Sequence, residues 1–220
     1  MKLFLTSAGF QDFQTKQIRR DLESVLREQC GDLRNKRACF LYTIRQESDQ
    51  TWLDLYDEEF KALGLPYDPV NISEELDGLA LPEYDIYYVC GGNTFYILDR
   101  LRKTRMDEVL KKAVQKGKIY IGVSAGSILA CPDISVAGIE TGDENDIHLS
   151  DATGFSWISF YISPHYGAAS DRMVVEKFFK EKQKPVIALT DKQMIAVTEA
   201  GIKLVGEKGG IQLGSIHLKG

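Results

Sequence analysis

Short apolar runs recur along this chain, and each is followed by turn residues and then by a segment of helical periodicity. The runs span residues 2–6, 38–43, 85–90 and 118–123. This order is typical of parallel strands, because a parallel pair needs a crossover segment, which is usually a helix. We therefore expect an α/β fold in which residues 1–220 form a single domain, with a mostly parallel sheet flanked by helices.

The spacing of apolar residues also predicts the helices, which should span residues 13–29, 51–63, 95–102 and a short stretch ending at Ala130. Gly31 should end the first of them. Pro66 and Pro69 predict an irregular path between helix and strand. In the C-terminal third the pattern changes to short strands joined by tight turns, at residues 157–163, 186–189, 194–197 and 203–205. That pattern predicts antiparallel hairpins that complete the sheet.

Composition excludes several classes of partner. The formal net charge is −5 and no stretch clusters Lys and Arg, so we expect no nucleic-acid or membrane partner. The N-terminal apolar run is too short for a signal peptide or a membrane span, which predicts a cytoplasmic protein. The cysteines lack the paired spacing of a metal site, so we expect four buried free thiols, no metal and no cofactor. They are Cys30, Cys39, Cys90 and Cys131.

The sequence Gly122-Val123-Ser124-Ala125-Gly126 lies between an expected strand and an expected helix. A Gly-x-Ser-x-Gly pattern in that context predicts a nucleophile elbow, a sharp turn that exposes the serine hydroxyl at the edge of the sheet. The glycines are needed because such a turn leaves no room for Cβ atoms beside the serine. Ser124 is thus the candidate nucleophile, and the Ala125 N–H is a candidate donor to an oxyanion. A serine that only caps its helix is the alternative.

Gly91-Gly92-Asn93-Thr94 forms a second strand-to-helix turn. Neighbouring turns of this kind share the ligand crevice of an open parallel sheet. Gly92 could therefore supply the second oxyanion N–H, and Asn93 could contact substrate. A plain glycine turn with Asn93 as helix cap explains the same residues.

A serine nucleophile needs a base, and the chain has three histidines. His165 follows an apolar strand, which places it where the sites of such sheets lie. His148 lies in an acidic stretch and His217 in the C-terminal tail. An orienting carboxylate should complete the site. The sequence between Ser124 and His165 leaves six candidates open, which are Asp133, Glu140, Asp143, Glu144, Asp146 and Asp151.

Three segments together resemble the dipeptidase E family of serine peptidases. They are Cys90-Gly91-Gly92-Asn93-Thr94-Phe95, the elbow with Ala130-Cys131-Pro132, and Ser163-Pro164-His165-Tyr166. The resemblance implies a flavodoxin-like three-layer sandwich like that of the class I glutamine amidotransferases. It also implies a Ser-His-acid site without a metal and a preference for dipeptides that begin with Asp. By motif, Ser124 matches the nucleophile, His165 the base, and Gly92 and Ala125 the oxyanion donors.

Two segments depart from the family pattern. Where the family carries an aspartate after the Cys-Pro pair, this chain has Ile139 followed by Glu140, so Glu140 becomes the expected orienting acid. The stretch after the histidine, Gly-Glu-Thr-Arg in the family, is Ala169-Ser170-Asp171-Arg172 here. Arg172 could bind a substrate carboxylate bidentately, although an ordinary surface arginine is the alternative.

The sequence therefore predicts a serine peptidase that cleaves short peptides, with N-terminal Asp as the implied preference, and leaves a homodimer open. One alternative is an esterase of the α/β-hydrolase type, which would take its base near the C-terminus, where His217 lies. Another is a binding or regulatory relative with weak catalysis. A glutaminase is disfavoured because that chemistry uses a thiolate and residue 124 is serine.

Overall fold

The computed structural model describes residues 1–47, 49–74, 76, 81–139 and 142–219. The helices are α1 (Arg20–Cys30), α2 (Asp49–Leu63), α3 (Thr94–Lys103), α4 (Met106–Gln115), α5 (Ala125–Ile128) and α6 (Ala169–Lys182), with 3₁₀ turns η1 (Leu33–Asn35) and η2 (Ser135–Gly138). The strands are β1 (Lys2–Thr6), β2 (Ala38–Tyr42), β3 (Tyr67–Asn71), β4 (Ile86–Val89), β5 (Ile119–Val123), β6 (Tyr161–Ser163), β7 (Val186–Ala188), β8 (Gln193–Thr198), β9 (Gly201–Gly206), β10 (Ile211–Leu213) and β11 (Leu218–Lys219).

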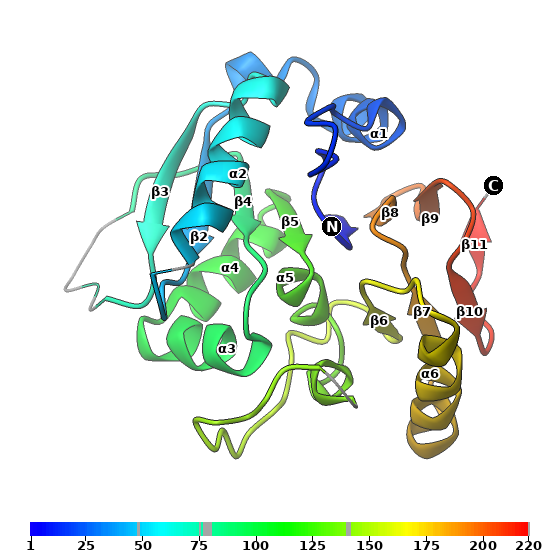
Figure 1. Ribbon diagram of the computed structural model, residues 1–220. Helices are drawn as coiled ribbons and strands as arrows, with labels where there is room; N and C mark the ends of the chain where they lie inside the picture. Colours follow the sequence, from blue (N-terminus) through cyan, green and yellow to red (C-terminus); the bar gives the residue numbers. More distant parts are fainter. Residues whose placement is uncertain (48, 75, 77–80, 140–141, 220) are drawn as a thin grey trace.

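The main sheet has eight strands in the order β11-β9-β8-β1-β5-β4-β2-β3, which runs from right to left in Figure 1. The five strands from β1 to β3 are all parallel, with β1 pairing β5 and β4 lying between β5 and β2. Strand β8 then pairs antiparallel with β1, and β9 antiparallel with β8. The expected mostly parallel sheet flanked by helices is confirmed.

A smaller sheet of three strands, in the order β10-β7-β6, lies beside α6. Strands β6 and β7 are parallel, with Ser163 opposite Ala188. Their carboxyl ends therefore lie next to each other, and the residues that follow them enter the same region of the molecule. This pairing positions two residues of the candidate site.

Strand side chains alternate between two packed faces of the main sheet. On one face, Phe40 and Tyr88 of the sheet pack against Tyr56 and Phe60 of α2, with ring centroids 4.9 to 5.9 Å apart. On the other face, the buried Tyr120 hydroxyl donates to the Gly126 carbonyl of α5 at 2.6 Å. Buried residues of the strands and helices form one hydrophobic cluster.

Most expected strands are found within one or two residues of their predicted bounds, but the first helix is shorter than expected. It begins at Arg20, not at residue 13, and ends at Gly31 as expected, where φ is 72°. The preceding residues form a turn instead, in which Lys16 N–H donates to the Asp12 carbonyl at 2.8 Å. Phe13, whose spacing indicated a helical face, packs edge-on against Trp52 of α2.

The C-terminal third confirms only part of the expected hairpins. Strands β8 and β9 form the antiparallel hairpin that extends the main sheet, whereas β6 and β7 are parallel and belong to the small sheet. The first of these strands also begins late, because the N–H groups of Trp157 and Ile158 both donate to the Ala130 carbonyl. Only Tyr161–Ser163 is left to pair as a strand.

Five helices and strands escaped the sequence prediction, namely α4, α6, β3, β10 and β11. Strand β3 contains Pro69 and is the last strand of the sheet. An edge strand tolerates proline because the missing N–H can face outward.

The four cysteines are free and buried, as expected. Among the described residues, no helix has both the length and the apolar character needed to cross a membrane.

Candidate active site

Ser124 lies at the sharp turn between β5 and α5. Its backbone has φ 50° and ψ −108°, a strained conformation for a residue with a side chain. A Cβ on Gly122 would overlap the Gly126 carbonyl, and a Cβ on Gly126 would overlap the carbonyl of Val89 on β4. Both flanking glycines are therefore required by close backbone contacts, as the sequence predicted. The alternative interpretation gave Ser124 the role of a helix cap. Its hydroxyl makes no capping hydrogen bond to α5.

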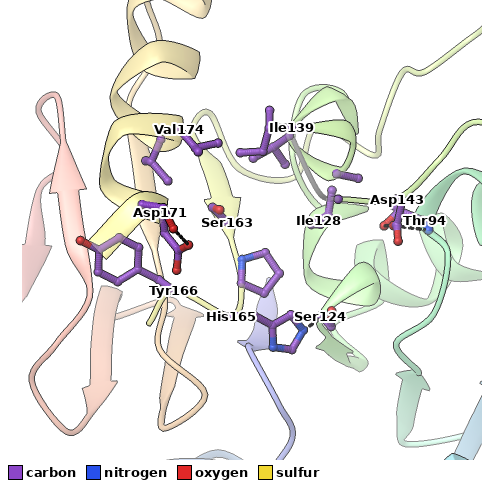
Figure 2. Close-up of a pocket in the computed structure, with 16 residues that line it drawn as sticks. Thr94, Ser124, Ile128, Ile139, Asp143, Ser163, His165, Tyr166, Asp171 and Val174 are labelled. Atoms are coloured by element: carbon purple, nitrogen blue, oxygen red, sulfur yellow. Dashed lines mark hydrogen bonds between the residues drawn. The ribbon is translucent and has the colours of Figure 1, made fainter. Parts of the chain in front are cut away.

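The Ser124 hydroxyl instead contacts His165. Ser124 Oγ lies 2.8 Å from His165 Nε2, within hydrogen-bond distance, and Figure 2 shows the two side chains facing each other. His165 follows β6 and also has a positive φ, of 60°. The expected pairing of nucleophile and base is therefore present in the geometry. His148 and His217 are exposed and do not line the cavity at Ser124.

The carboxylate on the other nitrogen of His165 is Asp191. Its Oδ1 lies 2.6 Å from His165 Nδ1. The hydrogen bond from His165 lowers the pKa of Asp191, and the Ser7 hydroxyl and the charge of Arg19 act in the same direction. Asp191 lies three residues after the end of β7, which is the parallel neighbour of β6, and β6 is the strand that precedes His165.

Asp191 lies outside the stretch in which the sequence interpretation sought the acid. Glu140, the expected acid, lies outside the described residues. The other candidates have different partners. Asp133 accepts the Tyr161 hydroxyl, Asp143 binds Thr94, Asp146 pairs with Arg45 and Asp151 with Arg102, and the backbone carbonyl of Glu144 accepts the Asn93 amide. Among the described residues, Asp191 is thus the candidate for the orienting acid.

A buried serine after β1 forms hydrogen bonds with both His165 and Asp191. Ser7 is fully buried, and its hydroxyl oxygen accepts the His165 backbone N–H at 2.8 Å. The same hydroxyl donates to Asp191 Oδ1 at 3.0 Å. Sequence reasoning missed Ser7, although its position at the carboxyl end of a central strand was a usable signal.

The turn after β4 lies against the elbow. A Cβ built on Gly91 would be 3.4 Å from the Ser124 Cβ. The Gly91 N–H donates to the Tyr56 hydroxyl at 2.9 Å. Within the described chain, no backbone hydrogen bond engages the N–H groups of Gly92 or Ala125. Gly92 and Ala125 therefore stay the predicted oxyanion donors.

Asn93 and Arg172, the two residues expected to bind substrate, have other partners. The Asn93 side chain caps α3 by accepting the Tyr96 N–H, and it donates to the Glu144 carbonyl. The Arg172 guanidinium lies 2.9 Å from Glu176 on the surface of α6, with 64% of its side chain exposed. Neither side chain lines the cavity. Each side chain thus makes the contact that its alternative, structural interpretation describes, a helix cap for Asn93 and a surface ion pair for Arg172.

Ser124 and His165 open into a cavity of about 320 Å³. Its walls come from α3, α5, η2, the end of β6 and the first turns of α6. The lining combines aliphatic side chains with polar ones, and its acidic side chains are Asp143 and Asp171 (Figure 2). Within the described part of the chain, no group of three or more His, Cys, Asp and Glu side chains could hold a metal ion.

Comparison with known proteins shows the family of this chain. The model of peptidase family S51 matches residues 3–205. The chain belongs to peptidase family S51. It is an S51 serine peptidase, and the resemblance to dipeptidase E is confirmed. Among its relatives, an uncharacterized peptidase of Pasteurella multocida is 30% identical over 66% of this chain and 72% of that protein. Peptidase E of a Nostoc species is 27% identical over 68% of this chain and 63% of its own length.

Solved structures share the fold of this S51 peptidase. The crystal structure of a putative peptidase E from Listeria monocytogenes superposes with a TM-score of 0.75 at 24% identity, covering 94% of this chain and 98% of that one. A peptidase from an acI-B1 actinobacterium gives a TM-score of 0.68 at 15% identity. At these sequence identities, the similarity shows only that the fold is shared.

Proposed function

We propose that this S51 peptidase hydrolyses short peptides through an acyl-enzyme on Ser124. The observation that carries the proposal is the continuous relay from Ser124 Oγ through the His165 ring to Asp191 Oδ1, at 2.8 and 2.6 Å. The chain order Ser124, His165, Asp191 differs from the Ser-acid-His order of α/β-hydrolases. It therefore disfavours the esterase alternative, which also required His217.

The chemistry follows from the geometry. As Ser124 Oγ attacks the scissile carbonyl carbon, His165 Nε2 takes the hydroxyl proton, and the Asp191 carboxylate stabilises the resulting imidazolium. The carbonyl oxygen becomes an oxyanion that the N–H groups of Gly92 and Ala125 can bind. The imidazolium then protonates the departing amine as the C–N bond breaks. Water, deprotonated by His165, releases the acid product and restores the Ser124 hydroxyl.

Cavity size and charge bear on the substrate. A volume of about 320 Å³ is at the small end of ligand pockets, which supports short peptides. The Asp preference implied by dipeptidase E would need a cation in this cavity, and its described lining contains no Lys or Arg. We therefore propose a peptidase of short peptides without a requirement for N-terminal Asp.

The test is active-site labelling together with turnover. A fluorophosphonate probe should label wild type on Ser124, and Ser124→Ala should lose labelling and about a thousandfold or more of peptide hydrolysis. His165→Gln should lose activity as well, whereas the matched variant His217→Gln should retain it. Activity of Ser124→Ala above about a hundredth of wild type would contradict the proposal. Absence of labelling and of peptide turnover in wild type would favour a binding protein instead.

A further inference from the structure

The catalytic cavity contains two carboxylates and no side-chain cation among its described lining residues. Asp143 lies on the α3 side of Ser124 and Asp171 on the α6 side of His165, and both are half-buried (Figure 2). The residues outside the described ranges include no Lys, Arg or His in the sequence. Arg172 follows the lining residue Asp171 in the sequence, but its side chain is paired with Glu176 on the exposed face of α6.

Both carboxylates are fixed in position by the backbone. Asp143 Oδ2 accepts the Thr94 N–H at 2.7 Å and the Thr94 hydroxyl at 2.6 Å. Asp171 Oδ2 accepts the N–H groups of Gly167 and Ala168 at 2.8 and 2.7 Å. Those two hydrogen bonds lower the pKa of Asp171, which therefore stays ionised at neutral pH. A ligand in this cavity meets fixed negative charge on two sides.

An aliphatic patch forms part of the wall between the two carboxylates. It is formed by Ile128 of α5, the η2 segment and its following residue, and the inner face of α6. The aliphatic side chains are Ile128, Val136, Ala137, Ile139, Val174 and Val175. A side chain that enters here exchanges water for hydrocarbon, which is favourable for an apolar group and costly for a charged one.

We propose that the cavity selects peptides with a free α-ammonium and an uncharged, aliphatic first side chain, and that it discriminates against N-terminal Asp. This inference rests on the proposed peptidase function of Ser124. A substrate Asp side chain would lie among aliphatic groups and like charges without a counter-charge, whereas an aliphatic side chain would pack against the wall.

Asp143 is the partner of the α-ammonium in this proposal. It binds Thr94, two residues after Gly92, and so lies on the side of the cavity where the acyl part of the substrate has its oxyanion. The α-ammonium is attached beside the scissile carbonyl, which brings it to the same side. One oxygen of Asp143 is committed to Thr94, and no described residue donates a hydrogen bond to the other.

The experiment compares kcat/KM for dipeptides that differ only in the first residue, Leu, Asn or Asp, and for N-acetylated Leu-X. We expect Leu-X to exceed Asp-X by about tenfold or more, with Asn-X above its charged isostere Asp-X. N-acetylation should lower kcat/KM by about tenfold or more, because it removes the ammonium. Asp143→Asn keeps an acceptor for Thr94. It should reduce both the ratio of kcat/KM between Leu-X and Asp-X and the loss of kcat/KM on N-acetylation. Arg172→Met is the matched control and should leave the whole series unchanged.

Several outcomes would overturn the inference while sparing the peptidase function. Asp-X could be the best substrate, Arg172→Met could lose Asp-X cleavage selectively, or the acetylated peptide could be cleaved as well as the free one. Labelling of Ser124 without cleavage of any member of the series would also overturn it. Unchanged peptide cleavage by Ser124→Ala would instead contradict the proposed function, so the two failures are distinguishable.

Discussion

At the scale of single residues, the site depends on which carboxylate orients His165. An orienting carboxylate fixes the imidazole tautomer and stabilises the imidazolium. Asp191 has the required contact at 2.6 Å from Nδ1, and Asp191→Asn keeps its size while removing its charge. We expect kcat to fall by about 10³ to 10⁴, as for comparable triads. The measurement is steady-state hydrolysis of the best dipeptide.

Glu140→Gln is the matched control for that experiment, because Glu140 is the acid that the family pattern indicates. We expect it to change kcat little. A large loss in Glu140→Gln together with near-normal turnover in Asp191→Asn would show that Glu140 orients the histidine and that the contact of Asp191 is structural.

Ser7 is a positioning residue at the same scale, because it acts only through His165 and Asp191. Ser7→Ala deletes the acceptor of the His165 N–H and a donor to Asp191. We expect kcat to fall by about tenfold, with KM nearly unchanged and a similar slowing of fluorophosphonate labelling. A purely structural role predicts a lower stability with normal kcat, and that result would contradict the assignment.

At the scale of secondary-structure elements, the sequence predicted those elements that local sequence patterns determine. The strands β1, β2, β4 and β5 and the elbow at Ser124 were found because apolar runs, glycine and turn residues are local signals. Asp191 was missed for a different reason. It joins His165 only because β6 and β7 are parallel neighbours, and strand pairing between distant segments leaves no local mark in one sequence. The available signal was a carboxylate, Asp191, at the second position after the apolar run of residues 186–189.

The close packing of α5 on β4 at the elbow leads to a prediction about stability. Gly126→Ala would force a Cβ into the Val89 carbonyl, so α5 and β4 would have to separate. We expect a loss of at least about 2 kcal/mol in the free energy of unfolding, because the clash is with backbone and cannot relax by a rotamer change. Urea unfolding measures this change.

Gly167→Ala is the control for Gly126→Ala. A Cβ on Gly167 would meet no atom within 4 Å. It should unfold within about 0.5 kcal/mol of wild type, as surface substitutions usually do. Equal stability of the Gly126 and Gly167 variants would contradict the close packing of α5 on β4.

At the scale of the whole molecule, the loop after β1 connects the site to the packed helices. Ser7 at one end of this loop contacts His165, and Phe10 and Gln11 at the other end are held by Glu59 of α2. Glu59 Oε2 accepts the two backbone N–H groups, and Oε1 accepts the Tyr88 hydroxyl at 2.6 Å. One buried carboxylate thus joins α2, the β1 loop and β4.

Burial of Glu59 makes stability depend on pH through this junction. Desolvation raises the pKa of Glu59, although its three hydrogen bonds oppose that effect. As pH rises above about 4.3, the ordinary Glu value, the unfolded chain loses this proton first and the folded chain retains it. The contribution of Glu59 to the free energy of unfolding is therefore fully present below pH 4.3 and falls until the raised pKa is passed, by about 1.4 kcal/mol per pKa unit.

Glu59→Gln isolates this contribution, because Gln is nearly isosteric and cannot ionise. The free energies of unfolding of wild type and variant, measured in urea from pH 4 to 8, should differ by an amount that changes with pH. We expect wild type to lose stability relative to the variant as pH rises through this window. Carboxylates with lowered pKa values, such as Asp191, contribute equally to the stability of both proteins, so their contributions cancel in the difference. A difference that stays constant would mean that the hydrogen bonds from Phe10, Gln11 and Tyr88 balance the desolvation of the carboxylate, and one that moves in favour of wild type with rising pH would mean that they outweigh it.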